Sequence, residues 1–146
     1  MYKFGQKSQD KLDTCHKDLQ IIMNEVIKYY DISILEGHRT LKQQKDYFKR
    51  GLSKLDGVNK KSKHQNYPSM AVDIIPYKKG TNAFSGQVED TMRFFYLAGL
   101  VKAITEELLE EGKITHNIRW GGDWNSNDVF TDQVFNDYPH FELIKD

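Results

Sequence analysis

Four residues that lie far apart in the sequence have the side chains that a catalytic metal site would need: His64, Asp73, Asp137 and His140. Two imidazoles and one carboxylate can hold a divalent metal ion and leave a fourth position open for water. The second carboxylate can then stand beside that water as a base. Three protein ligands with one open position are typical of hydrolytic sites, whereas four protein ligands are typical of structural zinc sites.

The other three of the five histidines are poorer candidates for metal ligands. His16 belongs to a predicted helix and is expected near its surface, and His116 follows a predicted turn and is expected to be solvated. His38 follows a predicted strand, where a role beside the metal ligands or in substrate binding stays open. The single cysteine excludes a thiolate cage, so the ligands must come from histidines and acids. Among the five histidines, His64 and His140 remain as the candidate imidazole ligands.

Apolar periodicity predicts the elements that position these residues. A helix over residues 8–27, capped by Ser8, has one apolar face. A strand over 32–36 precedes a helix over 41–50, which Thr40 caps and Gly51 ends. The apolar face of the first helix is formed by Leu12, Cys15, Leu19, Ile22, Met23, Val26 and Ile27.

The second half of the chain continues this mixture of strands and helices. A long polar loop over 52–69 leads into a strand over 70–75 that Pro76 ends. Asp73 lies within this apolar strand, where its charge needs a metal, another cation or several donors. Gly112 ends a helix over 87–111, and strands follow over 117–121 and 140–144. The helix is expected to bury Met92, Phe95, Leu97, Ala98, Val101, Ile104, Leu108 and Leu109.

Helices and strands do not alternate regularly, so the predicted fold class is α+β: one domain over residues 1–146, with helices packed on a small antiparallel sheet. The 21 basic residues balance the 21 acidic ones, which argues against a nucleic-acid-binding protein. A lysine cluster at residues 54–63 fits either a solvated loop or contact with an anionic polymer. No segment resembles a signal peptide or a membrane-spanning helix, so accumulation in the cytoplasm is expected.

Five stretches, in this order and spacing, also form a family pattern. The chain resembles the zinc peptidases of the D-alanyl-D-alanine carboxypeptidase type (VanY-like), and within them the phage L-alanyl-D-glutamate peptidases that serve as endolysins. The resemblance implies a fold like that of hedgehog and D-Ala-D-Ala peptidases. The stretches are Phe4-Gly5, Glu36-Gly37-His38-Arg39-Thr40, Ser62-Lys63-His64 through Ala71-Val72-Asp73-Ile74-Ile75-Pro76, Arg119-Trp120-Gly121-Gly122-Asp123-Trp124, and Asp137-Tyr138-Pro139-His140-Phe141-Glu142-Leu143.

The resemblance implies a separate role for each site residue. His64, Asp73 and His140 match the three ligands of one catalytic zinc ion. Asp137 matches the catalytic acid/base, and Arg39 matches the arginine that faces the substrate carbonyl or the developing oxyanion. The loop between His64 and Asp73 is longer than is usual in the family, which bears on substrate preference more than on metal binding.

The implied reaction is hydrolysis of the L-alanyl-D-glutamate bond in the peptidoglycan stem peptide, which lyses the bacterial wall. The predicted elements use nearly every residue, so no separate wall-binding domain is expected, and a monomer is the default expectation. The missing signal favours a phage endolysin, made in the host cytoplasm and released to the wall or periplasm by a holin or by membrane damage. One alternative is a D-alanyl-D-alanine carboxypeptidase or dipeptidase. Another is a non-catalytic wall-binding module of the same fold.

An oxygen-rich segment follows Trp120 and has two interpretations. Asp123, Asn125 and Asn127 alternate as in a calcium loop, although the glycine and the terminal glutamate of an EF-hand are missing. Because some phage relatives are regulated by calcium, one interpretation is a regulatory calcium site. The other is a capped turn, with Trp120 and Trp124 packing under the cleft.

Overall fold

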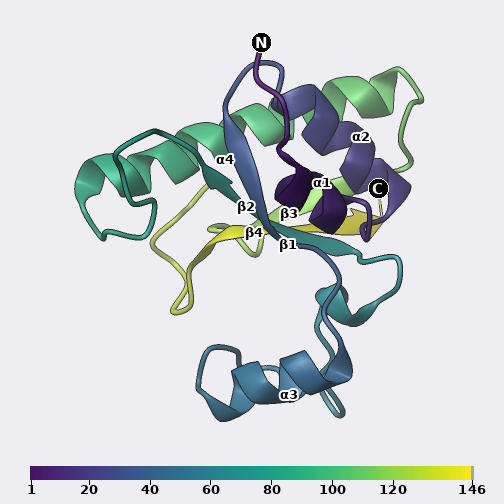
Figure 1. Ribbon diagram of the computed structural model, residues 1–146, viewed down its shortest axis with the longest axis vertical. Coiled ribbons are helices and arrows are strands. Elements are labelled where there is room, and N and C mark those ends of the chain that lie inside the picture. The colour runs from purple at the N-terminus through teal and green to yellow at the C-terminus, as the bar shows by residue number, and fades with distance from the viewer. Residues whose placement is uncertain (146) are drawn as a thin grey trace.

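A four-stranded antiparallel sheet with the strand order β1-β2-β4-β3 is the centre of the fold. The structure, a computed structural model, describes residues 1–145. The helices α1, α2 and α4 lie on one side of the sheet, and α3 lies apart on the other side (Figure 1). The elements are α1 (Gln6–Leu12), α2 (Lys17–Val26), β1 (Ile32–Glu36), α3 (Leu41–Lys49), the 3-10 helix η1 (Lys63–Gln65), β2 (Ala71–Pro76), α4 (Val88–Glu110), β3 (His116–Gly121) and β4 (Asp137–Lys145).

The hydrophobic core lies between the sheet and the helices α1, α2 and α4. Val72 pairs with Phe141 across β2 and β4, and both side chains are buried in this core. The next pair along the strands is Asp73 with His140. Because successive side chains of a strand point to opposite faces, Asp73 and His140 lie on the face away from the core. The α+β prediction with helices on a small antiparallel sheet is therefore confirmed.

The prediction of one continuous first helix is wrong. The helix is broken after Leu12, and α2 starts again at Lys17. The backbone of the break pairs with a distant segment, because Ser69 donates to the Thr14 carbonyl and His16 donates to the Ser69 carbonyl, at 2.9 and 2.8 Å. Since the pairing satisfies these backbone groups, the helix can end without orphaned donors. All seven residues of the predicted apolar face are nevertheless buried.

Two predicted caps have different outcomes. Ser8 lies inside α1 and does not cap it; its hydroxyl accepts a hydrogen bond from the backbone nitrogen of Ile34 in β1 at 3.0 Å. Thr40 caps α3 in a reciprocal capping box with Gln43, as the sequence predicts. The predicted capping residue Ser8 instead anchors α1 to the sheet.

The long helix α4 confirms its predicted bounds to within a residue and corrects one buried position. Met92 is exposed, and Phe94 is buried in its place, at 2% exposure. The predicted loop over 52–69 contains the short η1, and β4 begins at Asp137, earlier than predicted. Within residues 1–145, none of the helices combines the length and the apolar character that a bilayer crossing needs.

Candidate metal centre

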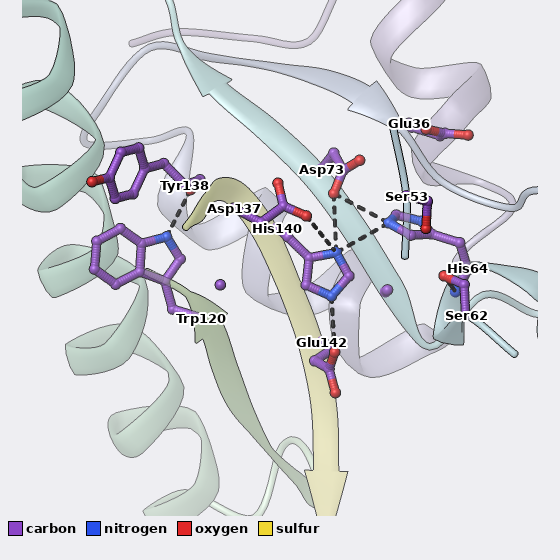
Figure 2. A network of polar contacts seen from close by, with 12 residues as sticks. Glu36, Ser53, Ser62, His64, Asp73, Trp120, Asp137, Tyr138, His140 and Glu142 are labelled. Atoms are coloured by element: carbon purple, nitrogen blue, oxygen red, sulfur yellow. Dashed lines mark hydrogen bonds and ion pairs between the residues drawn. The ribbon is translucent and has the colours of Figure 1, made fainter. Parts of the chain in front are cut away.

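The structure brings His64, Asp73 and His140 together in one buried cluster (Figure 2). Asp73 and His140 are direct cross-strand partners on β2 and β4. His64 comes from η1, where the Ser62 hydroxyl accepts a hydrogen bond from the His64 backbone nitrogen and caps the turn. Two adjacent strands and one capped turn therefore fix the three side chains.

The three potential ligand atoms form a nearly equilateral triangle. Asp73 Oδ1 lies 3.1 Å from His64 Nε2 and 3.2 Å from His140 Nδ1. The two ring nitrogens are 3.3 Å apart. A tetrahedral zinc ion with metal–ligand bonds of about 2.0–2.1 Å requires ligand separations of about 3.3 Å. The side of the triangle therefore fits a tetrahedral metal.

The outer nitrogen of each histidine has a fixed acceptor, which sets the state of the inner nitrogen. His64 Nδ1 lies 2.7 Å from the Gly37 carbonyl oxygen, and His140 Nε2 lies 2.9 Å from Glu142 Oε1. Both outer nitrogens must donate, so in the neutral rings the lone pairs are on His64 Nε2 and His140 Nδ1. These lone pairs converge with an oxygen lone pair of Asp73, an arrangement that a cation at the centre stabilises.

The pKa values of His140 and Asp73 are both shifted toward their charged forms. Burial opposes the charged form of His140, but hydrogen bonds to Asp73 and Glu142 outweigh it and raise the pKa of His140 to about 9. Burial likewise opposes ionisation of Asp73, yet the two histidines hold the pKa of that carboxyl well below its usual range. Without a metal ion, His140 thus keeps a proton that the Asp73 and Glu142 carboxylates stabilise.

Asp137 lies beside this cluster at the start of β4. Its Oδ2 is 3.9 Å from His140 Nδ1, and its side chain is partly exposed to the cleft. Burial and the nearby Asp73 carboxylate both raise the pKa of Asp137. Asp137 pairs with Gly121 of β3, where a Cβ atom would lie only 2.2 Å from the Asp137 carbonyl oxygen. Only a glycine at this position lets the chain carrying Asp137 approach so closely.

Arg39 lies next to Asp73 of the cluster and is almost completely buried. Its guanidinium donates two hydrogen bonds of 2.9 Å to the Glu36 carboxylate and one of 2.7 Å to Gln44 Oε1. Arg39 Nη2 is 3.8 Å from Asp73 Oδ2, and the guanidinium also lies over the Tyr47 ring. A guanidinium has five N–H donors, so Arg39 is held rigidly while donors remain for a substrate.

A single cleft of about 480 Å³ joins all five predicted site residues. Its size suits a short peptide segment. The remaining wall comes from the α3 side and from the loop before β4. The other lining residues are Tyr47, Leu52, Ser53, Lys54, Leu55, Ser62, Lys63, Trp124, Phe135 and Glu142.

Sequence reasoning gave no role to Glu142, Glu36 or Gln44, although all three support the site. Glu142 accepts from His140 and from Arg119, which outweighs burial and lowers its pKa to about 2. The signal for Glu142 was present, since His140 and Glu142 are two residues apart on one strand and share a face. The sequence carried no such signal for Glu36. Glu36 lies opposite Asp73 only because the register of β1 shifts between Ile34 and Glu36, and such a shift is not visible in the sequence.

The segment predicted as either a calcium loop or a capped turn forms the capped turn. The Asp123 carboxylate accepts hydrogen bonds from the backbone nitrogens of Asn127 and Asp128, at 3.2 and 2.9 Å. The side chains of Asn125 and Asn127 donate to Asp132. Because the turn uses these groups itself, the arrangement gives no support to a calcium site.

Three histidines lie outside the candidate metal centre. His38 contacts the Asn66 carbonyl and the Tyr67 ring, away from the cleft. His16 caps α2, as its Nδ1 accepts from the Asp18 backbone nitrogen. The prediction of a solvated His116 is wrong, because its Nδ1 lies 2.8 Å from Asp18 Oδ2.

The group of His16, Asp18 and His116 could also hold a metal by distance alone, but its chemistry differs. Asp18 Oδ2 already accepts hydrogen bonds from the backbone nitrogens of Thr115 and His116 and from the Thr115 hydroxyl. The Nδ1 atom of His16 accepts the hydrogen bond that caps α2. We therefore interpret this group as the tie between α2 and the start of β3.

Comparison with known proteins identifies the class of enzyme. The family model of the phage L-alanyl-D-glutamate peptidases matches residues 1–144, and the chain belongs to this family. The protein is therefore a peptidase of L-alanyl-D-glutamate type, as the motifs indicated. The alternative of a non-catalytic module has no support from this match.

Two curated relatives have names that agree with the family, and one solved structure shares the fold. The L-alanyl-D-glutamate peptidase of Escherichia phage T5 is 29% identical over 149 residues, covering 98% of both chains. The peptidoglycan L-alanyl-D-glutamate endopeptidase CwlK of Bacillus subtilis is 29% identical over 122 residues, or 80% of this chain and 63% of CwlK. The crystal structure of the L-Ala D-Glu endopeptidase ChiX of Serratia marcescens shares the fold, with a TM-score of 0.69 at 22% identity, over 98% of this chain and 91% of ChiX.

Proposed function

We propose that the protein is a zinc-dependent peptidoglycan peptidase that cleaves the L-alanyl-D-glutamate bond of the stem peptide. His64, Asp73 and His140 hold one zinc ion. The triangle of Asp73 Oδ1, His64 Nε2 and His140 Nδ1, with sides of 3.1, 3.2 and 3.3 Å, supports this assignment. A bound zinc ion supplies a Lewis acid and lowers the pKa of a coordinated water to about 7.

Asp137 and Arg39 perform the proton and charge chemistry. The partly exposed Asp137 carboxylate takes the proton from the attacking water and passes it to the leaving amine of D-glutamate. The raised pKa of Asp137 suits a group that must both accept and return a proton. The free donors of Arg39 bind the carbonyl oxygen of L-alanine and stabilise the oxyanion as it forms.

The biological role that follows is that of a phage endolysin. Residues 1–146 act as one peptidase domain and a monomer, made in the host cytoplasm and passed to the wall with the aid of a holin. There the enzyme lyses the host by cutting stem peptides. The similarity to the phage T5 peptidase over nearly its whole length supports this role.

One experiment tests both the metal and the bond. The purified protein is assayed for zinc and then incubated with peptidoglycan, and the products are analysed by mass spectrometry. We expect one zinc ion per chain and a new N-terminal D-glutamate. Released D-alanine would instead indicate a carboxypeptidase, and zinc-independent cleavage would contradict the proposed metal chemistry.

A further inference from the structure

One arginine and two lysines line the cleft, and the charges of two of these three side chains are already balanced by carboxylates. Arg39 binds Glu36, and Lys63 lies 3.2 Å from Glu142 while also donating to the Leu143 carbonyl oxygen. Lys54 differs, because no carboxylate among residues 1–145 forms an ion pair with it. Its ammonium group instead lies 5.5 Å from the centre of the Phe135 ring. Lys54 therefore brings an uncompensated positive charge to the cleft wall.

The backbone around Lys54 is fixed by the same side chain that holds Arg39. Gln44 is fully buried, and its Nε2 donates to Ser53 Oγ and to the Leu55 carbonyl oxygen, at 3.0 and 2.7 Å. Gln44 Oε1 accepts from Arg39 Nη1. Both neighbours of Lys54 and the guanidinium of Arg39 thus share one anchor. Ser53 and Lys54 both line the cleft that contains His64, Asp73 and His140.

The substrate presents an anion close to the scissile bond. In an L-alanyl-D-glutamate bond the glutamate nitrogen is acylated, and only one of the two glutamate carboxyl groups can carry the next residue. The other remains as a free carboxylate, unless the host converts it into an amide. A carboxylate in a cleft that already contains Asp73, Asp137 and Glu142 needs a cation of its own.

We propose that Lys54 binds the free carboxylate of the D-glutamyl residue and determines specificity for it. The inference rests on the proposed function. Arg39 is less suited to this task, since Glu36 already balances its charge and leaves it a donor for a neutral carbonyl group. The contact with Phe135 restrains the ammonium through the ring face and leaves its N–H groups available.

The test uses two synthetic stem peptides that differ only at this group, one with a free carboxylate and one with a carboxamide. The zinc-loaded wild type is compared with Lys54→Met, with Lys54→Arg, and with the matched control Lys61→Met from the same loop but outside the cleft. We expect Lys54→Met to lower kcat/KM for the carboxylate peptide by about tenfold and to leave the amide peptide unchanged. Lys54→Arg should retain most of the preference, and Lys61→Met all of it.

The possible failures are distinguishable. Equal losses on both peptides, or no loss on either, would overturn the role of Lys54 while the proposed function stands. Equal cleavage of the two peptides by the wild type would overturn it as well. If the wild type released neither a new N-terminal D-glutamate from the carboxylate peptide nor the corresponding N-terminal amide from the carboxamide peptide, the proposed function would fail and the Lys54 proposal with it. Thermal melting and zinc content verify that each variant is folded and loaded.

Discussion

The buried carboxylate of Glu142 offers the sharpest test of the proposed metal centre. Glu142 does not reach the candidate metal position; it accepts the hydrogen bond from His140 Nε2 at 2.9 Å. In Glu142→Gln the amide oxygen can still accept this bond, but the negative charge is lost. We therefore expect weaker zinc binding although His64, Asp73 and His140 are unchanged.

The size of the effect follows from the type of bond. A hydrogen bond to a charged partner contributes about 1.5–3 kcal/mol, against about 1 kcal/mol for a neutral pair. The difference is about 0.5–2 kcal/mol. The middle of this range is close to the roughly 1.4 kcal/mol that corresponds to a tenfold change in an equilibrium constant. Carboxylates behind metal-binding histidines typically have effects of about this size, 10–100-fold. The expected zinc Kd of Glu142→Gln is therefore about tenfold higher than that of the wild type.

Competition with a chromophoric zinc chelator measures this change directly. The matched control is Arg119→Gln, which also removes the ion pair between Arg119 and Glu142 but leaves the acceptor of His140 charged. The control should bind zinc nearly as tightly as the wild type. An unchanged Kd in folded Glu142→Gln, or an equal loss in Arg119→Gln, would refute the reasoning.

Three further predictions concern other parts of the molecule. Asp137→Asn should keep its zinc but lower kcat by about 100-fold or more, measured by peptide release; wall lysis near the wild-type rate would contradict the acid/base role. In the zinc-free protein His140 has a pKa of about 9, raised from 6.5, so its charged form stabilises the fold below about pH 6.5 and this stability is lost as the pH rises through 9. Chemical denaturation should show a loss of at most about 3 kcal/mol over this range, and a flat profile would contradict the ion-pair geometry. Burial raises the pKa of the Cys15 thiol to about 12, so thiol reagents should label it only on unfolding, and rapid labelling of the native protein would show that the α1–α2 break is open.

The sequence predicted the elements where local signals were strong. Thr40 followed by Gln43 specified the start of α3, and Gly51 and Gly112 have the positive φ expected just after α3 and α4. The break between α1 and α2 carried no comparable signal, because Cys15 continues the apolar face through it. Its cause is pairing with Ser69, a contact between segments that are distant in the sequence.

The candidate site divides in the same way. The sequence by itself determined the residue types and their motifs, namely two histidines and two aspartates. It also placed Asp73 inside an apolar strand, where its charge needs a partner. Only the tertiary structure decided that Asp73 and His140 are cross-strand partners and that Gly37 and Glu142 turn both histidine lone pairs inward. The physical reason is that side-chain chemistry is a local property, whereas register, tautomer and the Gln44 link between Arg39 and the Lys54 loop depend on contacts between distant segments.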